Sequence, residues 1–303
     1  MGAEWVSARI NIEPRSPAAI APRTDFRSDA VVVLVNVTVR DRANRPVTSL
    51  QREDFCLFEN KVEQQVAYFV NEEVPVSIGV IFDSSGSMGA KLTTAREAIG
   101  QLLKSSNRDD EFFLIQFSDR PELVSAFTPS PDEVQNRLLT TVSKGRTSLL
   151  DGIYLGLHQM KSARNQRRAL VVVSDGGDNH SRYSESEIKN LTRESDVQIY
   201  AIGLFEPVVT RERSAATLKG PALLEELAQE TGGRHFPARN LGDLPGVAAN
   251  IGSTLRHQYL LGYTSTDPAR DGKYRKVQVK VAPHRFQSAL QTDWKRGYYA
   301  PGQ

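Results

Sequence analysis

Oxygen-bearing side chains stand at alternating positions directly after one apolar stretch of the chain. The segment Ile-Phe-Asp-Ser-Ser-Gly-Ser-Met ends the apolar run Val74–Phe82 and places Asp83, Ser85 and Ser87 behind it. In open α/β sheets, ligands bind outside the carboxyl ends of the strands. Carboxylate and hydroxyl oxygens suit Mg²⁺, Mn²⁺ or Ca²⁺ and do not suit zinc or copper, and Gly86 allows a tight turn. We therefore expect this loop to bind a hard divalent cation.

The pattern Asp-x-Ser-x-Ser resembles the metal ion-dependent adhesion site of von Willebrand factor type A domains. Two further segments follow in the order of that family. Gly145-Arg146-Thr147 precedes a predicted helix and is similar to the family's Gly-Gly-Thr loop, with Arg146 where the family commonly has glycine. Ser174-Asp175-Gly176 follows a predicted strand and is similar to the loop that carries the family's aspartate. The resemblance covers about residues 74–256.

This resemblance implies a set of metal ligands and a mode of recognition. Ser85, Ser87 and Thr147 are implied to bind the cation directly, and Asp83 and Asp175 to bind it directly or through water. Mg²⁺ is the implied cation, with Mn²⁺ and Ca²⁺ as alternatives. One coordination position is left for an Asp or Glu of a partner protein. The implied function is a metal-dependent protein-binding or adhesion module, and not an enzyme.

Other interpretations of the same residues stay open. Ser and Asp often satisfy only the backbone of a turn, and Thr147 fits the cap of the helix that follows it. A scaffold that binds no metal would keep the fold, whereas a metal-assisted hydrolase would use the cation to activate water. Residues 86–93 lack the G-x-x-x-x-G-K-[ST] spacing of a phosphate loop, and no G-x-S-x-G elbow surrounds Ser85 or Ser87.

The elements that position these loops follow from the apolar pattern. Continuous apolar strands separated by amphipathic helices indicate a Rossmann-like α/β domain, whose mainly parallel central sheet is covered by helices. The predicted strands are Val74–Phe82, Glu111–Phe117, Leu170–Val173 and Val197–Leu204. Ser130 with Glu133, and Ser184 with Glu187, are typical of helix-start capping boxes. Further helices are predicted around Leu92–Leu102, Leu150–Met160, Leu223–Leu227 and Leu244–Leu255.

Strand-like alternation occupies both ends of the chain, as in Val31–Val39 and Val277–Val281. Neither end alone offers enough strands for a stable sandwich. We therefore expect residues 29–73 and 257–303 to form one β-sandwich, with the α/β domain of residues 74–256 inserted and residues 1–28 as a loosely ordered arm. The wider order is similar to bacterial von Willebrand factor A-related proteins, notably acidobacterial ones, in which segments like Val47–Leu50 and Tyr259–Tyr263 flank the domain.

Composition narrows the class of partner. The 303 residues include 38 basic and 36 acidic side chains, and a net charge of +2 does not favour nucleic acid. Cys56, the only cysteine, is expected in a buried strand and excludes an intramolecular disulfide. No stretch of about 18 apolar residues predicts membrane insertion. No signal peptide is recognised, so the compartment is left open, with secretion or the periplasm expected if a leader has been trimmed. Lys161, Arg164, Arg167 and Arg168 are expected to be a solvated helix end and loop, with a docking patch as the alternative.

Overall fold

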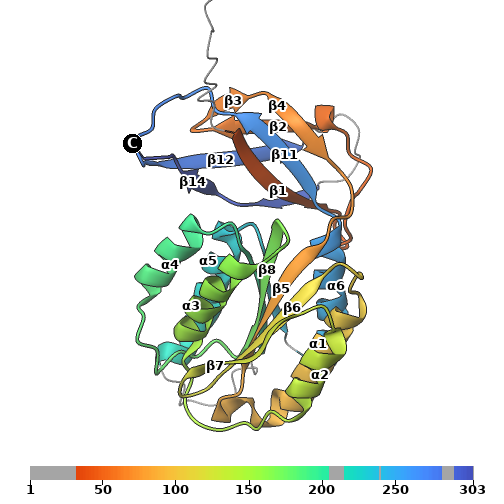
Figure 1. Cartoon of the computed structure of the whole chain (residues 1–303), viewed down its shortest axis with the longest axis vertical. Coiled ribbons are helices and arrows are strands. Elements are labelled where there is room, and N and C mark those ends of the chain that lie inside the picture. The colour runs from red at the N-terminus through yellow and green to blue at the C-terminus, as the bar shows by residue number, and fades with distance from the viewer. Residues whose placement is uncertain (1–31, 205–214, 239, 282–289, 303) are drawn as a thin grey trace, which may run out of the picture. The chain divides into compact units, whose positions relative to one another are not determined.

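The computed structural model describes residues 32–204, 215–238, 240–281 and 290–302, and its largest sheet has six strands. Their order is β10-β9-β8-β5-β6-β7, of which Figure 1 labels β8, β5, β6 and β7. Neighbouring strands are parallel except β7, which lies antiparallel to β6 at one edge. The strands are β5 (Val76–Asp83), β6 (Glu111–Phe117), β7 (Pro121–Thr128), β8 (Arg167–Ser174), β9 (Gln198–Leu204) and β10 (His235–Ala238). The predicted Rossmann-like fold with a mainly parallel sheet is confirmed.

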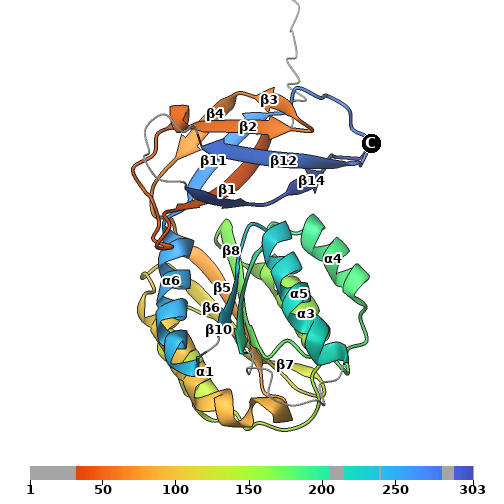
Figure 2. The same ribbon diagram turned by 180° about the vertical axis from the view of Figure 1, so that it is seen from behind.

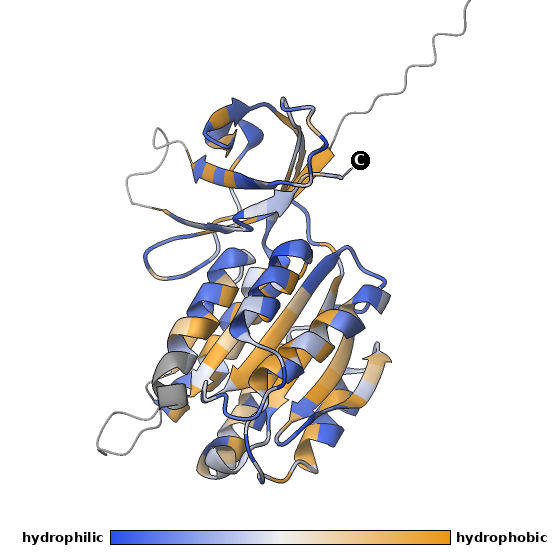
Figure 3. Ribbon diagram, turned by 90° about the vertical axis from the view of Figure 1, so that its left-hand side faces the viewer, coloured by the Kyte–Doolittle hydropathy of each residue, from blue (hydrophilic) through white to orange (hydrophobic). Residues whose placement is uncertain are grey.

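Amphipathic helices cover both faces of this sheet (Figure 1). One face packs against α1 (Leu92–Lys104), α2 (Pro131–Leu139) and α6 (Leu244–Arg256), and the other against α3 (Leu149–Gln159), α4 (Glu185–Glu194) and α5 (Ala215–Glu230). Successive side chains of β5 alternate between the two cores, with Phe82 in one and Ile81 in the other. Figure 3 shows that the strands are apolar along most of their length. Burial on both faces explains why the strands are continuously apolar.

Two helices begin where the capping signals predict. Ser130 Oγ accepts the Glu133 amide at 3.4 Å and Pro131 opens α2, while the Glu133 carboxylate accepts from Ser125 Oγ. At α4 both halves of the box form, because Ser184 Oγ accepts the Glu187 amide and the Glu187 carboxylate accepts the Ser184 amide at 2.8 Å. The bonds from the amides of Glu133, Glu187 and Ser184 each satisfy a backbone donor that the helix itself leaves unpaired.

The two ends of the chain build one pair of antiparallel sheets. One sheet has the order β13-β1-β11-β4 and the other β14-β12-β2-β3. Their strands are β1 (Val32–Arg40), β2 (Phe55–Glu59), β3 (Val62–Gln64), β4 (Val66–Val70), β11 (Tyr259–Thr264), β12 (Tyr274–Val281), β13 (Gln291–Trp294) and β14 (Gly297–Tyr299). Strand β1 pairs with β11, and β2 pairs with β12, so each sheet joins both ends (Figures 1 and 2). One apolar core of valines and aromatic rings fills the space between them. The sandwich expected from both ends is confirmed.

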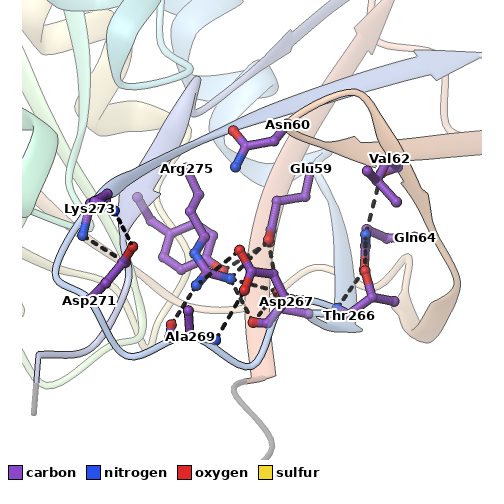
Figure 4. Close-up of polar contacts among 12 residues, drawn as sticks. Glu59, Asn60, Val62, Gln64, Thr266, Asp267, Ala269, Asp271, Lys273 and Arg275 are labelled. Carbon is purple, nitrogen blue, oxygen red and sulfur yellow. Dashed lines mark hydrogen bonds and ion pairs between the residues drawn. The ribbon is translucent and has the colours of Figure 1, made fainter.

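A buried ion pair lies inside this sandwich (Figure 4). Arg275 Nη1 is 3.2 Å from Glu59 Oε1, and neither side chain is more than 4% exposed. Burial raises the pKa of Glu59, but hydrogen bonds from Tyr263, Tyr298 and other donors outweigh it and leave the pKa below its ordinary value. Arg275 also donates to the carbonyl of Asp267 at 2.7 Å, which ties the β11–β12 loop to the core. The negative charge of Glu59 is therefore compensated by Arg275 and by the hydroxyls of Tyr263 and Tyr298. We interpret this ion pair as structural.

Some expectations differ from the structure. Strands β7 and β10 were not predicted, and Cys56 is half-buried on β2 instead of buried. Arg167, expected in a solvated group, is only 4% exposed and donates to carbonyls of Leu255, Arg256 and Gln258. The predicted arm, residues 1–28, lies outside the described residues.

The transitions between sandwich and α/β segments fall in short connections. Strand β4 ends at Val70 and β5 begins at Val76, while α6 ends at Arg256 and β11 begins at Tyr259. The division at residues 73 and 256 stays a prediction. None of the described helices is both long and apolar enough to cross a membrane.

Candidate metal-binding site

Asp83 lies at the carboxyl end of β5, beside the end of the neighbouring strand β8. The two strands are parallel, with Phe82 opposite Val173, so Asp83 and Ser174 lie at the same edge of the sheet. Asp83 is fully buried, and its two carboxylate oxygens accept hydrogen bonds from Ser174 Oγ at 2.6 Å and from the Ser85 amide at 2.8 Å. These bonds fix the orientation of the carboxylate.

The serines that follow Asp83 face different neighbours. The Oγ atoms of Ser85 and Ser87 lie 3.0 Å apart, whereas Ser84 Oγ donates to the Phe117 carbonyl at 3.0 Å. Two oxygens bound to adjacent corners of a Mg²⁺ octahedron lie roughly 3.0 Å apart, because Mg–O distances are about 2.1 Å. The spacing of Ser85 and Ser87 therefore fits two ligands of one cation, and Ser84 does not take part.

The loop that carries Thr147 is bonded to the serine loop. The Gly86 amide donates to the Gly145 carbonyl at 3.0 Å. Gly145 has a φ of +79°, and a Cβ there would lie 2.7 Å from Asp119 Oδ2, so this position requires glycine. Arg146 has no positive φ, its amide donates to Asp119 Oδ1 at 2.9 Å, and its side chain is exposed. An arginine is therefore accommodated where the family commonly has a second glycine.

Thr147 is held through its backbone. Its amide donates to Asn179 Oδ1 at 3.0 Å, and its carbonyl accepts the amides of Asn179 and His180, both at 3.1 Å. The residue is 4% exposed. The N-cap of α3 is Ser148, and Leu150 near the start of that helix donates instead to Asp178 Oδ2 at 3.2 Å. The alternative that Thr147 caps α3 is therefore wrong, which leaves its hydroxyl without that structural role.

Asp175 follows β8 and lies next to a lysine that the sequence did not single out. Lys91 Nζ is 3.5 Å from Asp175 Oδ2, and the two side chains are 8% and 12% exposed. Gly176 turns the chain with a φ of +78°. A Cβ on Gly220 of α5 would lie 1.6 Å from the Gly176 carbonyl oxygen, so α5 packs its backbone directly against this loop. Three loops thus meet at one edge of the sheet.

Comparison with known proteins agrees with this arrangement. Residues 78–177 match the family model of the von Willebrand factor type A domain. Over these residues the chain carries a von Willebrand factor type A domain. An uncharacterized protein of Borreliella burgdorferi is 27% identical over 180 residues, which cover 52% of each chain. The human inter-alpha-trypsin inhibitor heavy chain H3 is 26% identical over 133 residues, 40% of this chain and 15% of that protein.

A solved structure shows the same fold. The von Willebrand factor type A protein from Catenulispora acidiphila aligns with a TM-score of 0.52 and 10% identity, covering 91% of this chain and 74% of that one. The matched region spans about half the length of the Borreliella relative and a smaller part of the human one. The likeness therefore establishes the fold of the type A domain, and the role of its site is a separate question.

The electrostatics of the type A domain favour a cation beside Asp83. Burial raises the pKa of the Asp83 carboxyl to about 6, and the charge of Asp175 adds to the rise. Hydrogen bonds from Ser174 and Ser85 work against the rise without cancelling it. A buried carboxylate with a second carboxylate nearby is costly to ionise unless positive charge compensates it.

The chemistry of the donors fits a hard cation. Among the described residues there is no group of three or more His, Cys, Asp or Glu side chains that holds a metal by itself. The candidate site instead combines two carboxylates with neutral hydroxyls, and oxygen ligands of this kind suit Mg²⁺, Mn²⁺ or Ca²⁺. The structure links all five predicted residues through their loops. Three residues that hydrogen-bond to the predicted ligands were not predicted from the sequence: Lys91, Asn179 and Ser174. Their partners are Asp175, Thr147 and Asp83, which lie 32 to 91 positions away in the sequence.

Proposed function

We propose that the type A domain binds a divalent cation, Mg²⁺ above all, and through it holds an Asp or Glu side chain of a partner protein. The expected ligands are Asp83, Ser85, Ser87, Thr147 and Asp175. When bound, the cation supplies a Lewis-acidic position at which an incoming carboxylate is held. The chain would thus be a metal-dependent protein-binding or adhesion module.

The observation that carries this proposal is the paired serine hydroxyls beside a fully buried carboxylate. Ser85 Oγ and Ser87 Oγ lie 3.0 Å apart, and Asp83 accepts the amide of the same loop. Hydroxyl ligands are neutral, so Ser85, Ser87 and Thr147 orient a cation without adding to the charge that Asp83 and Asp175 already bring to it. A coordination position that these five residues leave open can then take a carboxylate oxygen of a partner.

The first test is metal binding by calorimetry and thermal unfolding. A ligand that binds only the folded state raises its stability by mass action. We expect Mg²⁺ or Mn²⁺ to raise the melting temperature relative to EDTA, and Ser85→Ala to lose this rise. Ser84→Ala is the matched control, because Ser84 Oγ donates to the Phe117 carbonyl and is not one of the proposed cation ligands. It lowers stability and retains the metal-dependent rise.

Equal melting of the wild type in Mg²⁺ and in EDTA, with no heat of binding, contradicts the proposal and favours the metal-free scaffold. A metal-assisted hydrolase instead predicts turnover of a phosphate or ester that Asp83→Ala abolishes. Once a partner is captured in Mg²⁺, changing its contacting Glu to Gln must abolish the chelator-sensitive part of the binding. Binding that survives both EDTA and that change contradicts the carboxylate mode of recognition.

A further inference from the structure

Lys91 places a positive charge beside the candidate metal site. It ends the 3₁₀ turn Gly86–Lys91, which follows the serine loop and leads into α1. The residue is 6% exposed, and its Nζ is 3.5 Å from Asp175 Oδ2. A lysine on a turn is normally solvated, so its burial at this position calls for a physical reason.

Helix stability does not provide that reason. Lys91 is the N-cap residue of α1 and makes no side-chain cap hydrogen bond there. The N-terminus of a helix carries partial positive charge, so a cation is unfavourable at this end. Burial of an ammonium adds a desolvation cost. The fold accepts both unfavourable contributions at a position where the Lys91 ammonium faces the Asp175 carboxylate.

We propose that Lys91 tunes this site, weakening its hold on the cation and strengthening the hold of the loaded site on a partner's carboxylate. The inference rests on the proposed function and deepens it. With Asp83 and Asp175 ionised, the empty site carries −2 from the carboxylates and +1 from Lys91, a sum of −1. A divalent cation changes the sum to +1, and one incoming carboxylate brings it to zero.

Without Lys91 the same sums are −2, 0 and −1, so the loaded site is less positive by one unit of charge and attracts a carboxylate less strongly. The ammonium therefore has opposite effects on the two binding steps, because it repels the cation and attracts the anion. These sums count only Asp83, Asp175 and Lys91; any other charge at the site adds the same amount to both sets, so the comparison uses only the difference of one unit at each step. A residue with a merely structural role does not produce effects of opposite sign.

The experiment compares wild type with Lys91→Met, using Mn²⁺ and acetate as probes. Met keeps an unbranched side chain of similar length without the charge. Calorimetry gives the Mn²⁺ affinity, and water-proton relaxation of the Mn²⁺-loaded protein reports the acetate that displaces bound water. We expect Lys91→Met to bind Mn²⁺ at least about tenfold more tightly and acetate at least about fivefold more weakly. Lys144→Met is the control, because Lys144 is exposed on the adjacent loop and its charge is screened by solvent.

Each outcome decides something. If wild type and Lys91→Met bind Mn²⁺ and acetate equally, or if both affinities change in the same direction, the inference is overturned while the proposed function stands. If wild type binds no Mn²⁺, the proposed function fails and the inference falls with it. Should Lys91→Met lose its native circular dichroism, Lys91→Gln replaces it, and the same opposite changes are required of that variant.

Discussion

Replacing Asp83 by Asn removes one buried charge and keeps its hydrogen bonds. The amide oxygen of Asn accepts the Ser85 amide as the carboxylate does, and Ser174 Oγ can accept from the new NH₂ group. The variant therefore isolates the cost of the charge from the loss of contacts. In EDTA the empty site lacks compensation by a metal, so the cost is fully expressed there.

The magnitude follows from the pKa of Asp83. Burial raises it from the ordinary 3.8 to about 6, and each pKa unit corresponds to about 1.4 kcal/mol. Because the pKa is raised in the folded state, this group's contribution to stability is complete below pH 3.8 and is lost as the pH rises through about 6. From well below pH 3.8 to well above pH 6 the folded wild type thus loses about 3 kcal/mol, and Asp83→Asn does not.

Urea unfolding in EDTA at several pH values measures this difference. We expect Asp83→Asn to exceed wild type by about 1 kcal/mol at pH 4.5 and by about 3 kcal/mol at pH 8. With Mg²⁺ at a hundred times its Kd, wild type gains about 2.7 kcal/mol and the variant gains nothing. A variant that is no more stable than wild type at pH 8 in EDTA, or a difference independent of pH, refutes the reasoning about burial.

Three further predictions test the parts around Asp83. Thr147→Val should keep the native circular dichroism and the melting temperature in EDTA, because backbone hydrogen bonds hold the loop and only the hydroxyl is removed. Its Mg²⁺ affinity, measured by calorimetry, should fall at least about tenfold. Unchanged affinity would exclude Thr147 as a ligand. Gly145→Ala should lower the free energy of unfolding by about 1–3 kcal/mol in urea, since φ is +79° and the new Cβ meets Asp119; an unaffected midpoint contradicts the strained-turn account. Arg167→Met should lower the free energy of unfolding in urea by at least about 2 kcal/mol, because it removes the donor that bonds buried carbonyls at the end of α6. An unchanged free energy of unfolding would mean that water replaces the guanidinium.

The parts of the fold that sequence predicts are those with strong local signals. Strand β5 is buried at every position and apolar at most of them, and the capping residues Ser130 and Ser184 mark helix starts directly. Strand β7 lacks such a signal, because an edge strand with exposed residues such as Glu122 and Leu123 shows no continuous apolar run. Strand β10 has four residues, too few for a periodic pattern.

The candidate site divides in the same way. The positions of Asp83 and Asp175 follow from a general rule, because the carboxyl ends of adjacent parallel strands meet at one edge of the sheet. Lys91 and Arg167 were not predicted to be buried, because each is placed by partners more than eighty positions away. The residues next to a lysine or arginine in the sequence do not reveal a partner that is distant along the chain. The burial of Lys91 and Arg167 is therefore seen only in the folded structure.

Anomalous diffraction at the manganese absorption edge, from crystals grown with Mn²⁺, tests the central claim most directly. The account predicts one strong peak beside β5 and β8, within roughly 2.0–2.6 Å of the hydroxyl oxygens of Ser85 and Ser87. It also predicts that the peak disappears in crystals of Ser85→Ala and remains in those of Ser84→Ala. Full Mn²⁺ occupancy elsewhere on the molecule, with no peak at these serines, would contradict it.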